Sequence, residues 1–114
     1  HISHGLSNSL VLPYVLRFNS VDVKAAKNYA ELAQYVFPNL NINQGNQAVC
    51  AEFIDKMEDL SKRLGLPQKL REVNIPKNAC EKMASDAMKQ TRLLVNNPRE
   101  VTEADALSIY QAAW

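Results

Sequence analysis

Residues 49–65, with the sequence VCAEFIDKMEDLSKRLG, decide the fold class of this chain. Their large apolar residues recur at spacings of three and four, which is the repeat of one face of an α-helix: Val49, Phe53, Met57, Leu60 and Leu64. Charged residues take much of the remaining surface, and Gly65 is well placed to end the helix in the left-handed backbone conformation that glycine tolerates. The stretch predicts an amphipathic helix with one buried face.

The same helical spacing extends outward from this stretch in both directions. A helix is predicted over Gly5–Phe18, with a kink at Pro13 because proline lacks a backbone N–H. Another is predicted after a cap at Ser20 or Asp22 and ends at Phe37-Pro38. Further helices are predicted as a short turn from Pro67, as a segment from residues 76–78 to about residue 97, and as a last segment behind a capping box of Thr102 and Asp105.

The chain shows no convincing strand, because no segment alternates with period two for long enough. The strongest alternative, residues 9–18, contains Pro13, which is unwelcome in a central strand. The pattern therefore predicts an all-α fold, a bundle of five or six helices. One shared core is expected from the inward faces of the best-patterned helices: Phe53, Met57, Leu60, Met83, Ala87 and Tyr110. The helix after Asp22 should bury one face: Ala25, Ala26, Tyr29, Leu32, Ala33 and Val36.

Composition limits the function classes. With 114 residues, 46% of them hydrophobic, the chain suits one domain with a real core. A net charge of +1 gives no basic surface of the kind that nucleic-acid binding requires. The longest apolar run, Leu10–Leu16, is far shorter than the roughly 20 residues that span a bilayer, so no membrane partner is expected. Cys50 and Cys80 lie in predicted helices and are expected to be reduced thiols in a cytoplasmic protein.

Few residues offer chemistry by themselves. The chain contains no glycine-rich phosphate loop, no paired-cysteine zinc spacing and no nucleophile elbow. His1 and His4 stand three residues apart and could meet one metal on a helix, although most such pairs in proteins bind none. A catalytic metal site needs at least three protein ligands. Nothing near His1 and His4 supplies the others, so such a site would have to take its remaining ligands from elsewhere.

Three separated segments carry a family resemblance. Residues 1–19, HISHGLSNSLVLPYVLRFN, resemble the segment that completes the metal site of iron-containing (group III) alcohol dehydrogenases. Residues 64–76, LGLPQKLREVNIP, and residues 96–114, NNPREVTEADALSIYQAAW, resemble two later motifs of the same family, in the same order. Because the three motifs span essentially the whole chain, the resemblance is far more specific than any single motif.

The resemblance implies a place for the chain in a larger enzyme. Residues 1–114 would be the C-terminal portion of its helical metal-binding domain, a fragment of the helical domain of dehydroquinate synthase-like proteins. The N-terminal nucleotide-binding domain and three further metal ligands, an aspartate and two histidines, would lie outside this chain. His4 matches the fourth metal ligand, and Gly5 and Asn8 match the family's next motif positions. His1 matches a variable position that lines the substrate cleft, where it is expected to serve catalysis.

The implied reaction is hydride transfer between an alcohol or aldehyde and NAD(P). Iron(II), or zinc in some members, acts as a Lewis acid on the substrate oxygen. The fragment alone is expected to hold no cofactor, to be inactive, and to self-associate, and the enzyme is expected to form a homo-oligomer. Two positions depart from the family pattern: Ser3 replaces a common proline, and Asn74 replaces a usual glycine, which is expected to strain its turn. The alternative is a free-standing helical interaction module without catalytic activity.

Overall fold

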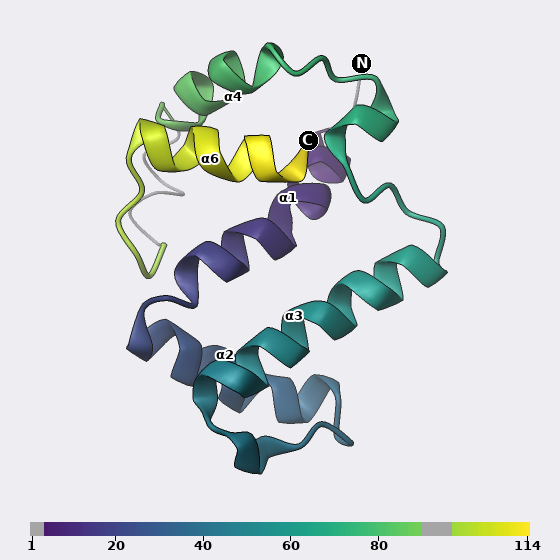
Figure 1. The fold of residues 1–114 in the computed structure, drawn as a ribbon, viewed down its shortest axis with the longest axis vertical. Coiled ribbons are helices and arrows are strands. Elements are labelled where there is room, and N and C mark those ends of the chain that lie inside the picture. Colours follow the sequence, from purple (N-terminus) through teal and green to yellow (C-terminus); the bar gives the residue numbers. More distant parts are fainter. Residues whose placement is uncertain (1–3, 90–96) are drawn as a thin grey trace.

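The computed structural model describes the backbone of residues 4–89 and 97–114, and the side chains from residue 9 onward within those ranges. The described chain is built from five α-helices and two short 3₁₀ turns (Figure 1): α1 (His4–Asn19), α2 (Val23–Val36), η1 (Ile42–Gln44), α3 (Asn46–Arg63), η2 (Leu70–Val73), α4 (Ala79–Ala87) and α6 (Glu103–Ala113). These residues contain no strand. The predicted all-α fold is confirmed.

Local sequence signals set several helix ends as expected. Of the two candidate caps, Asp22 is the one used, because its Oδ2 accepts a hydrogen bond of 2.9 Å from the backbone N–H of Ala25. Gly65 has a φ of 77° and follows α3 in the left-handed region. The N–H groups of Gly65 and Leu66 donate to the carbonyls of Lys62 and Ser61, the pair of bonds that closes a Schellman motif. At the start of α6, Thr102 and Asp105 form the predicted capping box.

Three elements differ from their predicted bounds. α1 begins one residue earlier than expected and continues through Pro13 to Asn19. The short turn of helix begins at Leu70 rather than at Pro67. The helix expected to reach about residue 97 ends at Ala87, where the Lys89 N–H donates back to Asp86 in a tighter turn than the α-helix allows. Its expected continuation over residues 90–96 lies outside the described residues.

The expectation of one shared core is wrong, because four of the six residues divide between two clusters and the other two belong to neither. Phe53 and Met57 pack with residues of α2 and the loop after it, whereas Met83 and Tyr110 pack with α1, η2 and α6. Leu60 is 46% exposed, and Ala87 is half-buried. The reason is geometric: α3 pairs with α2, and α4 pairs with α6, so faces with the same pattern meet different partners.

The buried face of α2 is also narrower than predicted. Ala25, Ala26 and Ala33 are buried as expected, and Ala30 joins them. Leu32 and Val36 are about half exposed, so the large apolar residues at this edge of α2 remain outside the core. Alanines let the backbones of α2 and α3 approach closely, and a Phe37–Phe53 edge-to-face contact, with ring centroids 5.9 Å apart, closes the end of the pair.

Both cysteines are buried and free of disulfide bonds, as the sequence predicted for their redox state. Burial raises the pKa of the Cys50 thiol, an effect that a hydrogen bond from Ser20 partly offsets. Burial raises the pKa of Cys80 as well, and nearby Lys77 works against it. Thiols held protonated in a core behave as small apolar residues rather than as nucleophiles.

Candidate functional site

Of the two candidate site residues, the structure describes the backbone of His4, at the start of α1. His4 is the first residue of this helix, so its backbone position is fixed by the packing of α1. His1 lies outside the described residues. The structure therefore places the beginning of the helix that carries His4, and it brings no second candidate residue to it.

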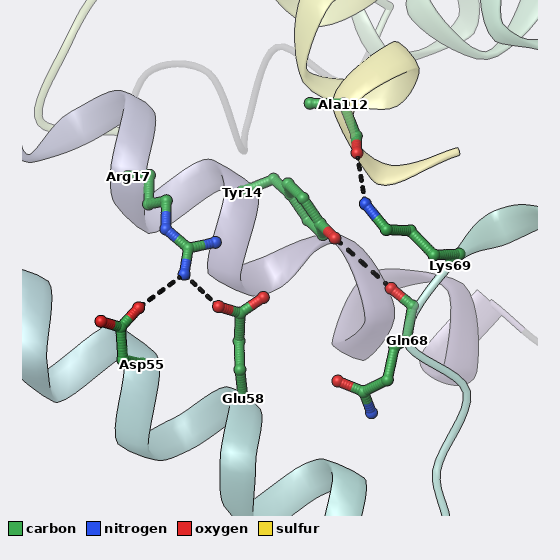
Figure 2. Close-up of polar contacts among 7 residues, drawn as sticks. All are labelled: Tyr14, Arg17, Asp55, Glu58, Gln68, Lys69 and Ala112. Atoms are coloured by element: carbon green, nitrogen blue, oxygen red, sulfur yellow. Dashed lines mark hydrogen bonds and ion pairs between the residues drawn. The ribbon is translucent and has the colours of Figure 1, made fainter.

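The N-terminal half of α1 is fixed by apolar packing. Leu10 and Val11 are buried against Leu70 of η2 and Ala113 of α6. Tyr14 packs on the same cluster, and its hydroxyl makes a long contact of 3.5 Å with the carbonyl of Gln68 (Figure 2). These contacts are spread over two further elements. The position of the start of α1 is therefore set by η2 and α6, which follow it by more than 50 residues.

A charged contact holds the same helix nearer its C-terminal end. The guanidinium of Arg17 points at α3, where it pairs with Glu58 and, at 3.0 Å, with Asp55 (Figure 2). The hydrogen bond to Glu58 contributes most to raising the pKa of Arg17, and partial burial works in the opposite direction. One arginine thus holds two carboxylates of α3 against α1. The predictions from the sequence treated these charges only as solvated surface.

A further polar group fixes the C-terminal end of α1. The amide of Asn19, only 2% exposed, exchanges hydrogen bonds with Asn97, and the Arg99 side chain donates to the carbonyl of Phe18 at 2.8 Å. From the sequence, Asn97-Pro98 predicts only the end of a helix. No local signal marks this contact. The hint was that Phe18-Asn19 and Asn97-Pro98-Arg99 both lie inside motifs of the resemblance.

Basic side chains surround the C-terminal end of α6, beside the N-terminal half of α1. Lys69 Nζ donates to the carbonyl of Ala112 at 3.0 Å (Figure 2), and Arg71 Nε donates to the carbonyl of Trp114 at 2.6 Å. Cations in this position complement the partial negative charge at the end of a helix. The indole of Trp114 donates to the carbonyl of Ile75 at 2.8 Å. These bonds fix the position of α6, against which Leu10 and Val11 pack.

The donor set of the described residues does not complete a metal site. Among residues 9–89 and 97–114, whose side chains the structure describes, no group of three or more His, Cys, Asp or Glu side chains is placed to hold a metal ion. A single histidine at the start of a helix supplies one ligand at most, whereas a catalytic site needs at least three.

The described helices also show no segment that is both long and apolar enough to cross a bilayer.

Comparison with known proteins gives a consistent picture. All of residues 1–114 match the family model described as Fe-containing alcohol dehydrogenase family, C-terminal. The chain is 32% identical over its whole length to long-chain-alcohol dehydrogenase 1 of Geobacillus thermodenitrificans, and 27% identical over 97% of its length to lactaldehyde reductase of Escherichia coli K12. It covers 28% of each of these relatives, so it spans little more than a quarter of their length.

Solved structures agree with this match. The fold superposes on a crystal structure of 1,3-propanediol oxidoreductase with a TM-score of 0.86 and 26% identity, and on an alcohol dehydrogenase from Oenococcus oeni with a TM-score of 0.85 and 26% identity. Each superposition covers 99% of this chain and 28% of the other. The fold of this chain therefore matches a little more than a quarter of each of these longer chains.

Proposed function

The chain belongs to the Fe-containing alcohol dehydrogenase family, and we propose that it is the C-terminal portion of the helical metal-binding domain of an NAD(P)-dependent alcohol dehydrogenase. The observation that carries this proposal is the match of all of residues 1–114 to the family's C-terminal region, with its motifs in order. A nucleotide-binding domain, supplied by chain outside residues 1–114, binds the cofactor. The protein transfers a hydride between the cofactor and a small alcohol or aldehyde.

His4 is the metal-ligating residue of this chain. It is the first residue of α1, and its motif position is that of a metal ligand in the family it resembles. A neutral imidazole nitrogen of His4 donates one bond, and an aspartate and two histidines outside the chain complete the set. The metal, iron(II) or zinc, supplies Lewis-acid polarisation of the substrate oxygen when bound. Apolar packing of Leu10 and Val11 holds the helix that begins at His4.

His1 acts catalytically without holding the metal. It stands one turn before His4 in sequence and belongs to the substrate cleft, where an imidazole can orient the substrate or move a proton. The protein acts in the cytoplasm as a homo-oligomer on small alcohols or aldehydes, without nucleic-acid or membrane partners. The isolated chain is inactive and holds no cofactor, because it carries only one ligand and no nucleotide-binding loop. Exposed apolar residues near the end of α3, Leu60 within the helix and Leu64 just after it, favour self-association of the isolated chain.

The test compares His4→Ala with His1→Ala in the full-length protein. His4→Ala should release the metal and lower turnover by roughly a thousand-fold, since a catalytic metal interaction is worth several kcal/mol in the transition state. His1→Ala should keep the metal and lower turnover by roughly ten- to a hundred-fold, as expected for a group that positions substrate or moves a proton. Metal content, turnover and a melting curve are measured for each variant.

The outcomes separate the possible roles. If His1→Ala loses the metal while His4→Ala keeps it, the two roles are reversed. If neither change affects metal content or turnover, the chain shares only the fold of the family. A start codon directly before His1, in place of an open reading frame for a nucleotide-binding domain, would favour the alternative of a free-standing helical interaction module.

A further inference from the structure

The described helices form two packing units that share α1. α2 packs on α3, α4 packs on α6, and α1 lies between the two pairs and contacts both α3 and α6 (Figure 1). The apolar clusters follow the same division. The α2–α3 pair contains Val49, Phe53 and Ile54, whereas Leu70 and Ala113 lie in the cluster beside the α4–α6 pair.

Pro13 falls near the border between these clusters. Leu10 and Val11, before the proline, pack with Leu70 and Ala113. Tyr14 and Val15, just after it, pack with the same cluster, and Leu16, within one turn of the proline, packs with the cluster that contains Ile54 of α3. Proline has no N–H to donate within the helix, so α1 lacks one backbone hydrogen bond near the point where its packing changes partners. Helical backbone alone is therefore a weak connection between the two pairs.

At the C-terminal end of α1, the buried side chain of Asn19 connects the two pairs. Asn19 Nδ2 donates to the hydroxyl of Tyr29 on α2 at 3.1 Å, and to Oδ1 of Asn97, before α6, at 2.9 Å. Asn97 Nδ2 donates back to Oδ1 of Asn19 at 2.8 Å. The group Asn19, Tyr29 and Asn97, here called the Asn19 joint, thus uses both N–H groups and the carbonyl oxygen of one amide that is 2% exposed.

The Asn19 amide makes all of its hydrogen bonds only when both pairs pack on α1. If the segment before α6 moves away, the buried Asn19 amide loses two hydrogen bonds, and if α2 moves away it loses another. An unsatisfied buried amide is costly, whereas a fully satisfied one specifies a single arrangement. We propose that the Asn19 joint couples the α2–α3 pair to the α4–α6 pair, so that the two pairs open and close as one cooperative unit.

The proposal makes no use of the metal, the cofactor or the reaction, so it stands apart from the proposed function. It is tested by hydrogen exchange in the full-length protein, read by mass spectrometry for peptides of α3 and of α6 separately. In the unaltered protein, the slowest amides of α3 and α6 should share one opening free energy and one dependence on urea, because cooperative units exchange together. Independent opening of α3 and α6 in the unaltered protein overturns the proposal.

Two variants cut the joint from opposite sides. Asn97→Ala removes the bonds to the segment before α6, and should accelerate exchange of α6 amides by about tenfold or more while α3 changes by less than about threefold. Tyr29→Phe removes only the hydroxyl bond to α2 and keeps the packed ring. It should give the reverse pattern, with α2 and α3 amides accelerated more than those of α6.

A matched control and a second outcome keep the proposal falsifiable. Asn28→Ala changes an exposed asparagine of α2, next to Tyr29 in sequence, and should leave both pairs unchanged. Equal acceleration of α3 and α6 in Asn97→Ala overturns the proposal, because it shows a general loss of stability rather than uncoupling. Unchanged exchange in both joint variants overturns it as well.

Discussion

Arg99 lies over the ring of Phe18, with its guanidinium carbon 3.9 Å from the ring centre, and its Nη1 donates to the carbonyl of the same residue at 2.8 Å. Arg99, in the segment before α6, therefore contacts both the side chain and the backbone of Phe18 near the end of α1. The carbonyls in the last turn of a helix have no partner within the helix and carry partial negative charge. A cation at this point satisfies one of them.

Loss of these two contacts should lower the free energy of unfolding measurably. Arg99→Ala removes a charge-assisted hydrogen bond and a cation–π contact, and should lower the free energy of unfolding by about 2 kcal/mol. Arg99→Lys should recover part of this loss, because lysine keeps the charge but not the planar guanidinium. The check is urea unfolding followed by fluorescence of Trp114, the chain's one tryptophan. Arg63→Ala, at a 75% exposed side chain, is the matched control and should change stability by less than about 0.5 kcal/mol.

The ion pairs of Arg17 should contribute modestly and depend on salt. The Arg17 side chain is 41% exposed, so solvent screens its attraction to Asp55 and Glu58. Arg17→Ala should lower the free energy of unfolding by about 1 kcal/mol at low salt, and by less in about 1 M salt, where the Debye length is about 3 Å. The measurement is a urea titration at both ionic strengths. A loss that does not change with salt would mean that Arg17 acts through the packing of its aliphatic stem.

At position 74, replacement by glycine should lower stability less than replacement by alanine. It ends η2 with a φ of 66° and a ψ of 28°, in the left-handed region that asparagine tolerates and β-carbon-bearing residues otherwise avoid. Asn74→Ala should therefore cost about 1 kcal/mol of stability, whereas Asn74→Gly should stay within about 0.5 kcal/mol of the original chain. Urea unfolding of the three chains gives the order. Asn74→Ala at least as stable as Asn74→Gly would contradict this account of the turn.

Stability should fall at alkaline pH through Tyr110. Burial raises the pKa of this phenol, and the charges of Asp86 and Cys80 add to the effect. The folded chain therefore holds the phenolic proton more tightly than the unfolded chain. This stabilising contribution is fully present below the ordinary pKa of about 10, and is lost as the pH rises through the higher folded-state pKa.

Tyr110→Phe tests this dependence directly. The variant should flatten the fall in the free energy of unfolding above about pH 10, because it removes the group whose ionisation favours unfolding. Tyr35→Phe, at a tyrosine that is 79% exposed, is the matched control and should leave the slope unchanged. The experiment is a series of urea titrations between neutral pH and pH 11. An identical slope in the original chain and the Tyr110 variant would refute the assignment.

The sequence by itself determined the helical class and several helix ends. Amphipathic spacing over residues 49–64 marked α3, and short-range chemistry marked the caps at Asp22, Thr102 and Gly65. These features depend on residues within one or two turns of each other, so neighbouring residues in the sequence are enough to predict them. The sequence also predicted a helix from Gly5, and α1 begins one residue earlier, at His4.

Only the tertiary structure decided which helices share a core and what holds α1. Leu60 fits the apolar stripe of α3 but stays 46% exposed, so the described residues leave that end of the stripe partly uncovered. Asn19 and Asn97 are ordinary polar letters in sequence, yet the fold brings them together across 78 positions as a buried pair. Periodicity reports which face of a helix is apolar, but not which partner covers it. That choice depends on how all the helices pack together, which is a property of the whole chain.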